Sequence, residues 1–376
     1  MLPALVVLYL FKIGSLIRGD GFRESIEYLG INGLSDLNSD ISYGPIKFLQ
    51  LLMVKIDEPN STLLRLVSAT LVIGSVILFY RLMRKWHTPR IAILSSILFA
   101  TSSYSLHMGR YSLATASLML VFPALLLFGT WLKSKRNVQK IIFIGPATAL
   151  SLYIPGIYIV ILALVLIFRQ RLLLAVQHMK RTQLYMGMSA TGLVLLPLIL
   201  AIIQNPNNLK YLSGLDSIPR SFKAFYDSLA QLPIDFVYSA NIEGYKWLTG
   251  SPILDVASII LLILGTYAYI RGEHPLRIRL IGIGVGLSWF IIMFSSTIDY
   301  ALILPLVYVV IANGIAYLLQ TWFTVFPKNP AARRTGVITV AILVLAISAF
   351  HGYRFFEVWP NTPETKESVV LQDPQK

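Results

Sequence analysis

The carboxylates best placed to do chemistry lie in the first long polar stretch of the chain, residues 18–45. This stretch follows an apolar run and holds Asp20, Glu24, Glu27, Asp36 and Asp40. A carboxylate can take the proton of a hydroxyl that attacks a substrate. We predict Asp20 as this catalytic base, because it directly follows the apolar run and so has a fixed position relative to the membrane surface. Asp40 is the second catalytic candidate, as the base or as a residue that orients the loop.

Cationic side chains that could bind an anionic substrate come later in the chain. Arg110 stands where a short polar turn meets an apolar run, and a guanidinium matches the oxygens of a phosphate. We predict that Arg110 binds phosphate with help from His107, and that Gly109 lets a headgroup approach closely. Anchoring of a helix at the membrane boundary is the alternative for these cations. Further candidates for substrate contacts are Arg65, Arg220 and Lys223.

The residue types give no support for a metal ion or another cofactor. The chain has no cysteine and only five histidines, which excludes thiolate chemistry and cysteine metal sites. The histidines are scattered, and no Asp-x-Asp pair occurs in the polar segments that we place outside. We therefore predict no metal and no cofactor. The net charge of +14 follows from membrane topology, as shown below, so no nucleic-acid partner is predicted.

The elements that must position these residues are membrane helices. The chain is 56% hydrophobic and 13% charged, whereas a soluble domain has about 25% charged residues. Apolar runs of 18 or more residues recur along it. We predict an all-α, polytopic membrane protein with a single domain over residues 1–376 and about 11 transmembrane helices. The predicted spans are 2–17, 63–82, 91–106, 113–132, a broken pair over 141–168, 184–203, 253–270, 280–296, 301–323 and 336–350.

Charge predicts the orientation of these spans. Residues 81–90, 133–140, 169–183, 271–279 and 327–334 hold 18 basic residues in 50 positions and only one of the 18 acidic residues, Glu273. Short basic loops face the cytoplasm. We therefore place residues 18–61, 204–252 and a polar tail at 351–376 on the extracytoplasmic side. We expect the cytoplasmic membrane of a prokaryote rather than the endoplasmic reticulum.

Two short helices are predicted at the extracytoplasmic surface. Residues 45–56 are mostly apolar but too few to cross a membrane. Phe222, Phe225, Tyr226 and Leu229 recur at the spacing of one helix face. Such a helix lies in the interface, either as an anchor or as a cover over a lipid entrance.

Several short motifs, in this order and spacing, resemble those of the GT-C membrane glycosyltransferases, which use polyprenyl-phosphate sugars and include protein mannosyltransferases and the lipid A aminoarabinose transferase. The motifs are Asp20, Asp40-Ile41-Ser42-Tyr43-Gly44-Pro45, Leu64-Arg65-Leu66-Val67-Ser68-Ala69 and Ser105-Leu106-His107-Met108-Gly109-Arg110. The resemblance implies inverting transfer of a sugar from a polyprenyl phosphate to a hydroxyl of a glycan, lipid or protein. It also makes Tyr43, which stands where members carry histidine, a substrate-binding candidate.

Departures from the family pattern keep other functions open. Gly21, Met108 and Asp299 stand where members often carry an acid, an acid and an arginine. They favour a non-catalytic or divergent assembly subunit with the same fold as one alternative. A lipid or polysaccharide transporter is another, but it predicts charged residues at mid-span and internal repeats. We find neither in this sequence.

Overall fold

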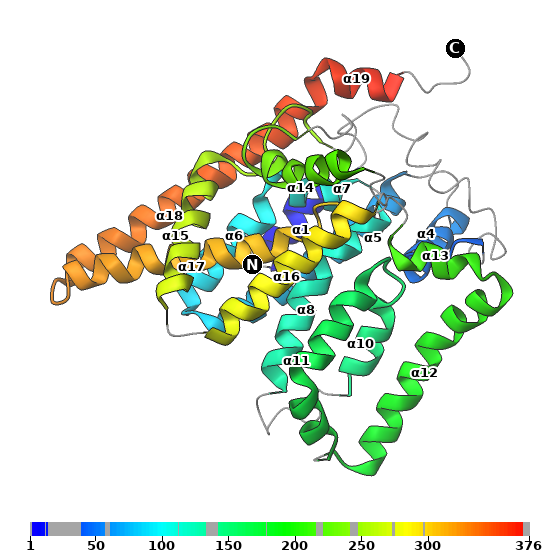
Figure 1. The fold of residues 1–376 in the computed structure, drawn as a ribbon. Helices are drawn as coiled ribbons and strands as arrows, with labels where there is room; N and C mark the ends of the chain where they lie inside the picture. Colours follow the sequence, from blue (N-terminus) through cyan, green and yellow to red (C-terminus); the bar gives the residue numbers. More distant parts are fainter. Residues whose placement is uncertain are drawn as a thin grey trace.

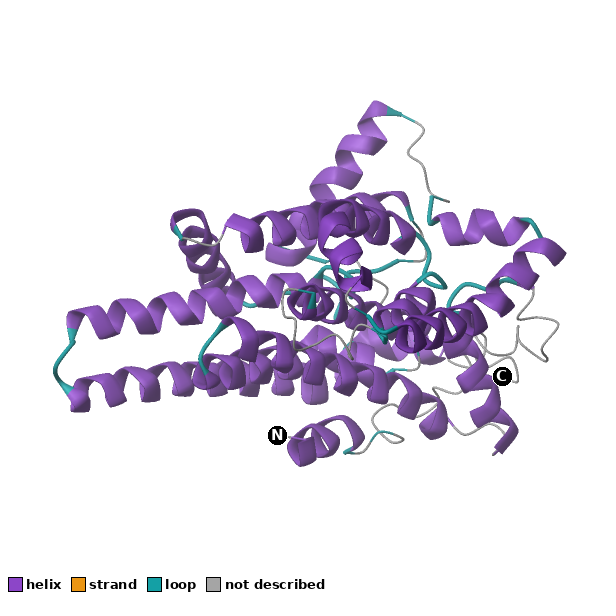
Figure 2. Cartoon of the chain, turned by 90° about the horizontal axis from the view of Figure 1, so that it is seen from below, coloured by secondary structure: helices purple, strands orange, loops and turns teal. Residues whose placement is uncertain are grey.

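The computed structural model describes residues 2–11, 13, 39–56, 61–111, 113–132, 142–177, 179–215, 221–240, 247–272, 275–295 and 298–370. Every regular element in these residues is helical (Figures 1 and 2), which confirms the all-α prediction. The principal helices are α1 (Leu2–Leu10), α4 (Gly44–Ile56), α5 (Ser61–Trp86), α6 (Pro89–Thr101), α7 (Ser103–Arg110), α8 (Leu118–Trp131), α10 (Ile144–Ser151), α11 (Ile157–Gln177), α12 (Arg181–Gln204), α13 (Asn207–Ser213), α14 (Phe222–Val237), α15 (Val256–Arg271), α16 (Pro275–Phe294), α17 (Leu304–Val325), α18 (Pro330–Tyr353) and α19 (Pro363–Val370).

Fewer helices than predicted are long enough to cross a membrane. In the described part, seven helices are long and apolar enough to cross a membrane, or eight if the bent pair of α6 and α7 is one span. A span needs about 20 residues, and the described part of α1 has nine, while α10 has eight. The protein is polytopic, but the structure does not confirm about 11 spans.

The apolar stretch after residue 141 breaks where its glycine and prolines predict a break. Helix α10 ends at Ser151 and α11 begins at Ile157. Between them Gly156 adopts φ of +68°, a conformation that favours glycine, and its N–H donates to the Leu212 carbonyl at 2.9 Å. Helix α11 then continues for 21 residues. It is therefore long enough to cross the membrane, in contrast to the predicted pair of short helices.

Small residues let the helices of the second half pack closely. A Cβ atom added at Gly265 of α15 would lie 2.0 Å from the Val310 carbonyl oxygen, and one at Gly314 of α17 would lie 2.1 Å from that of Leu261. Only glycine permits this approach, which is typical of helix packing in membranes. Asn313 adds a hydrogen bond of 3.0 Å to the Gly265 carbonyl. Helices α15 and α17 therefore pack closely against each other.

A sharp bend separates α6 from α7. The two helix axes differ by 60°, and Ser102 at the bend adopts an extended conformation. The Ser102 hydroxyl accepts a hydrogen bond from the Ser105 N–H, so it caps α7. The single predicted span over residues 91–106 is therefore two helices, because a cluster of serines offers the backbone local partners. The bend turns α7 toward the end of α1.

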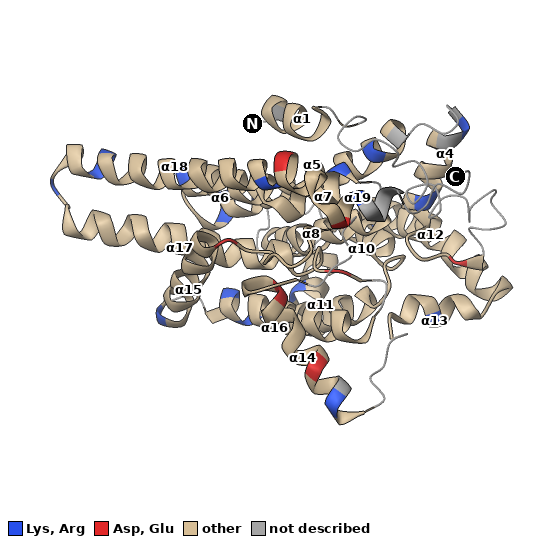
Figure 3. Cartoon of the chain, turned by 90° about the horizontal axis from the view of Figure 1, so that it is seen from above, with Lys and Arg blue, Asp and Glu red and all other residues tan. Residues whose placement is uncertain are grey.

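Basic residues mark two of the connections between helices. Figure 3 shows lysine and arginine at the turn between α17 and α18 and at the adjoining ends of α15 and α16. This is the pattern from which the orientation of the chain was predicted. That orientation remains a prediction.

Candidate functional site

Three of the predicted substrate-binding residues meet beside the end of α1. His107 and Arg110 are three residues apart on α7, so they share one helix face, and α5 contributes Arg65. All three are at least 95% buried. They line one small cavity together with Ile13, Tyr111, Phe355 and Trp359. Motifs that are separate in the sequence thus line one cavity.

The arginines of this site bind carbonyl groups at the C-terminal end of α1. Arg110 donates from Nη1 to the carbonyls of Leu8, at 2.9 Å, and Tyr9, at 3.1 Å, and from Nη2 to that of Phe11. Arg65 donates to the Ile13 carbonyl at 2.6 Å. The last carbonyls of a helix lack partners within it and carry partial negative charge. The two arginines therefore fix the end of α1 and the start of the segment that leads to Asp20.

Aromatic rings surround His107. Its imidazole lies edge-on to Trp359 at a centroid distance of 4.4 Å and to Phe355 at 4.8 Å, and Trp247 is 5.0 Å away. The Nδ1 atom of His107 and the Nε atom of Arg110 are buried without a hydrogen-bond partner. The cavity beside them measures about 10 Å³, which is room for about one water molecule. In this conformation the site is closed.

The closing residues come from the C-terminal segment, which was predicted as a polar tail. Helix α18 instead continues into a π-helical turn over Arg354–Val358 and a 3₁₀ turn over Trp359–Asn361. We call residues 354–361 the C-terminal cover. Phe355 and Trp359 are at most 2% exposed, and the Arg110 guanidinium lies 4.9 Å from the centre of the Phe356 ring. π-Helical turns occur often at functional sites.

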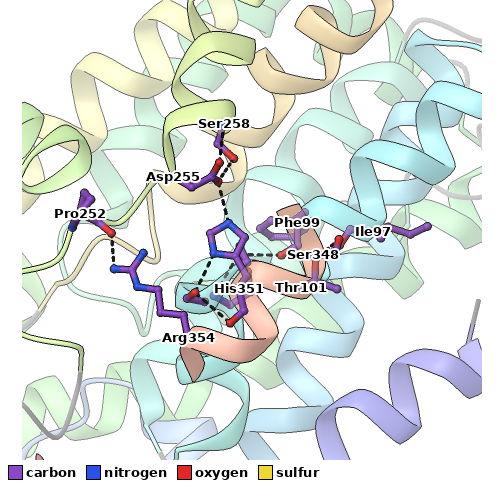
Figure 4. A network of polar contacts seen from close by, with 12 residues as sticks. Ile97, Phe99, Thr101, Pro252, Asp255, Ser258, Ser348, His351 and Arg354 are labelled. Carbon is purple, nitrogen blue, oxygen red and sulfur yellow. Dashed lines mark hydrogen bonds and ion pairs between the residues drawn. The ribbon is translucent and has the colours of Figure 1, made fainter. Parts of the chain in front are cut away.

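A buried polar network holds the cover and the bent helix in place (Figure 4). The Asp255 carboxylate at the start of α15 lies 3.0 Å from His351 Nε2, and Ser103 Oγ of α7 lies 2.8 Å from His351 Nδ1. Asp255 also accepts from the Ser258 N–H at 3.0 Å, as a helix N-cap does. Arg354 donates to the Pro252 carbonyl at 2.5 Å. The network joins α7, α15 and α18, and sequence reasoning missed it.

Asp40, the second predicted catalytic acid, has a partner for its charge. Its carboxylate lies 2.7 Å from Lys47 Nζ and accepts from the Ser42 N–H at 2.9 Å. Burial raises the pKa of Asp40, but the Lys47 ammonium and the Ser42 donors outweigh it and hold the pKa below its ordinary value. A general base works best with a pKa near the working pH. The contacts of Asp40 fit a residue that fixes the entry to α4.

The ion pair of Asp40 should appear in the pH dependence of stability. A carboxyl with a depressed pKa adds stability above its unfolded pKa, near 4, that is lost as pH falls through the folded pKa. Lys47→Gln should therefore lower the free energy of unfolding by less than about 1 kcal/mol at pH 7, since the Asp40 side chain is 44% exposed. Melting temperatures of wild type and variant should converge below pH 4. Lys55→Gln on the same helix is the control, and a difference that persists at low pH would contradict this.

Tyr43 lies at one end of a second, larger cavity. It is 6% exposed and adopts φ of +56°, an uncommon conformation for a residue with a side chain that is often found at functional sites. Its N–H donates to the Tyr153 carbonyl at 2.8 Å. The cavity measures about 400 Å³, and α4, α5, α8 and α10 supply its lining, which is almost wholly apolar. We call it the α5–α8 cavity.

The other predicted site residues are placed differently or lie outside the described part. Asp20 and Arg220 are outside the described residues. Lys223 is exposed on α14 and lines neither cavity described above. A Cβ atom added at Gly109 would lie 2.6 Å from the Tyr9 ring. This glycine therefore permits the contact between α7 and α1, and not the approach of a headgroup.

Comparison with known proteins identifies the region that holds most of the site. Residues 42–212 match the family model described as dolichyl-phosphate-mannose-protein mannosyltransferase. This stretch is therefore similar to a family of the GT-C type. The match confirms the resemblance drawn from the motifs and supports a membrane glycosyltransferase of the GT-C type. No curated protein and no solved structure matches the chain.

The mannosyltransferase-family region covers less than half of the 376 residues. It contains Tyr43, Arg65, His107 and Arg110, and every residue that lines the α5–α8 cavity. Asp20 precedes it, and the C-terminal cover and Asp255 follow it. The candidate binding residues and the residues that close the cavity therefore come from different regions of the sequence.

Proposed function

We propose that the protein transfers a sugar from a polyprenyl phosphate to an acceptor hydroxyl at the extracytoplasmic face. The acceptor oxygen attacks the anomeric carbon and gives its proton to Asp20. The bond from that carbon to the phosphate oxygen breaks, and polyprenyl phosphate leaves, with inversion at the sugar. The acceptor is a hydroxyl of a glycan, a lipid or a protein. No metal ion is part of this proposal.

The observation that carries the proposal is the meeting of Arg65, His107 and Arg110 at the end of α1. Two guanidinium groups supply positive charge where a leaving phosphate gains negative charge. The residues Leu71 and Leu78 of α5 line the α5–α8 cavity, and Leu71 is about 9 Å along the helix from Arg65. A phosphate near the arginines would thus have its polyprenyl chain in this cavity. The cavity volume is within the range of ligand sites.

Donor binding in this proposal requires the C-terminal cover to move. The present cavity of about 10 Å³ is too small for a phosphate. Phe355 and Trp359 close it from one side, and the donor would displace them as it enters. Arg110 would then exchange some of its bonds to the α1 carbonyls for phosphate oxygens.

Consumption of a labelled donor tests this function. Purified protein incubated with radiolabelled polyprenyl-phosphate sugars should release polyprenyl phosphate when an acceptor is present. Arg110→Ala should weaken donor affinity and turnover together, about 10-fold or more, because the guanidinium that can hold two phosphate oxygens is lost. Arg110→Lys should restore only part of both, since an ammonium cannot hold two oxygens in the same way.

Two results would overturn this assignment. Absence of donor loss with every polyprenyl-phosphate sugar would support the non-catalytic subunit that Gly21, Met108 and Asp299 favour. Unchanged donor affinity in Arg110→Ala, with reduced expression or membrane insertion, would make this arginine an anchor for α1 only. Lys210→Ala removes an exposed cation of α13 that lines neither cavity. It is the matched control for loss of a cation, and it should leave donor affinity unchanged.

A further inference from the structure

A second apolar groove lies outside the mannosyltransferase-family region. It measures about 390 Å³ and is formed by α14, α15, α16 and α17, which lie along one side of the helix bundle (Figure 3). Its lining residues Val237, Ile270 and Gly282 are exposed, so the groove opens toward the surface. No residue that lines it belongs to the α5–α8 cavity. It is a separate site.

The groove runs along the helices from one side of the membrane toward the other. At one end it is lined by Leu232 and Phe236 of α14, and the ring of Phe225 lies 6.4 Å from that of Phe294 at the last turn of α16. At the other end it is lined by Tyr269 and Ile278, on either side of the connection between α15 and α16. Trp289 is 11 residues from Ile278, which is about 16 Å along α16. The groove therefore suits an extended apolar chain.

Two hydrogen-bond donors in this groove have no partner. The Tyr269 hydroxyl and the Trp289 indole N–H are buried and make no hydrogen bond. The whole Tyr269 residue is only 7% exposed. A buried polar group without a partner is unfavourable, and such groups are uncommon in folded proteins. A ligand with acceptor oxygens beside Tyr269 would supply a partner for that hydroxyl.

The charge around Tyr269 indicates a negative headgroup. The groove ends at the connection between α15 and α16, where Arg271, Arg277 and Arg279 stand within nine positions. Arg271 follows Tyr269 by two residues, and Arg277 directly precedes Ile278, which lines the groove. The Arg277 guanidinium lies 5.1 Å from the centre of the Trp86 ring and donates to the Trp86 carbonyl at 3.3 Å. Basic segments at the membrane surface attract anionic lipids.

The position of this end excludes the sugar donor as the occupant. Tyr269 is 14 residues along α15 from Asp255, which is about 20 Å. Asp255 belongs to the network beside the candidate site, so the headgroup end of the groove faces the other side of the membrane. A lipid seated there has its phosphate far from Arg65 and Arg110.

We propose that this groove binds one anionic glycerophospholipid of the leaflet opposite the candidate site. Its acyl chain lies along α15 and α16 toward Trp289, its phosphate or ester oxygens accept from Tyr269, and its charge lies among the basic residues of the connection. This inference does not depend on the proposed transfer reaction.

Two glycines of α16 provide a matched pair of variants. A Cβ atom added at Gly282, which lines the groove, or at Gly286, which does not, would have no neighbour within 4 Å. Gly282→Leu should therefore fill the groove without disturbing the fold, and Gly286→Leu should add the same bulk outside it. Full-length protein in detergent is mixed with dioleoyl phosphatidylglycerol, and binding is followed by native mass spectrometry and melting temperature.

Phosphatidylglycerol should bind wild type and Gly286→Leu alike and raise their melting temperatures. Gly282→Leu should lose this binding about 10-fold or more, and Tyr269→Phe should lose it about 5- to 10-fold, as for one hydrogen bond to a charged group. Tyr267→Phe, two residues away, is the control for Tyr269. Dioleoyl phosphatidylcholine, with the same chains, should bind wild type more weakly.

Several outcomes would overturn the proposal. Equal binding of phosphatidylglycerol to Gly282→Leu and wild type would exclude the groove as the site. Equal losses in Gly282→Leu and Gly286→Leu would show a general effect of α16. Equal binding of phosphatidylcholine would exclude recognition of charge. Tighter binding of undecaprenyl phosphate at this groove would identify a polyprenyl lipid, and not a phospholipid, as the occupant. A Gly282→Leu protein that fails to fold would leave Tyr269→Phe against Tyr267→Phe to decide.

Discussion

Asp20→Asn should lower turnover about 100-fold or more and leave donor affinity nearly unchanged. Asparagine keeps the size of the side chain but cannot accept the proton of the acceptor hydroxyl, and general base catalysis contributes about 10²- to 10⁴-fold. Donor contacts would persist, because the candidate phosphate-binding residues Arg65 and Arg110 are untouched. Single-turnover kinetics with a labelled donor would measure the chemical step, and equilibrium binding of that donor would measure affinity.

The matched control is Asp40→Asn. The Asp40 carboxylate already holds Lys47 at 2.7 Å, so its loss should reduce stability slightly and leave the chemical step in place. Near-normal turnover of Asp20→Asn together with an inactive Asp40→Asn would move the base role to Asp40. Normal turnover in both variants would exclude both acids.

Asp255→Ala should reduce the free energy of unfolding by about 3 kcal/mol. Removing one partner of a buried ionic or hydrogen-bonded pair leaves the other partner unsatisfied, and loss of an N-cap adds to the cost. Here His351, which is fully buried, and the first turn of α15 would both lose their acceptor. Denaturant titration in detergent measures this change. Asp255→Asn keeps acceptor oxygen and should recover part of the loss.

Thr101→Val supplies the comparison for the Asp255 variant. Thr101 donates to Ser348 Oγ at 2.8 Å, so this bond also joins α6 to α18, but it lies outside the chain of contacts from Asp255 to Ser103. Its loss should cost about 1 kcal/mol. Equal effects of Asp255→Ala and Thr101→Val would mean that the carboxylate is not the centre of the network.

The helices were predictable because their signals are local. Apolar runs predict α5, α8, α12 and the four helices from α15 to α18 to within six residues at each end, and the break before Ile157 follows from Pro155 and Gly156. The length of α11 was not predictable in this way. The basic residues Arg169 and Arg171 predict a loop, but long cationic side chains can extend from a helix to the membrane surface.

The candidate site was predictable only in part, because its contacts join distant residues. His107 and Arg110 were found from a motif and share a helix face, so their proximity follows from spacing alone. Nothing in the spacing indicates that Arg110 binds the carbonyls of α1, or that Phe355 packs against His107. The network from Asp255 to His351 joins residues that are 96 positions apart. In the sequence, Asp255 has only the signature of a helix N-cap.

The separation of Ser103 and His351 along the sequence has a consequence for biosynthesis. These hydrogen-bonded residues are 248 positions apart, and a ribosome adds about 5 to 20 residues per second. Roughly 10 to 50 s therefore pass between their appearances. During this time α7 can already hold Arg110 against the carbonyls of α1, which precede it in synthesis, while His351 and the C-terminal cover do not yet exist. The nascent chain thus forms the contacts between Arg110 and α1 first. The site stays open until the last helices are inserted.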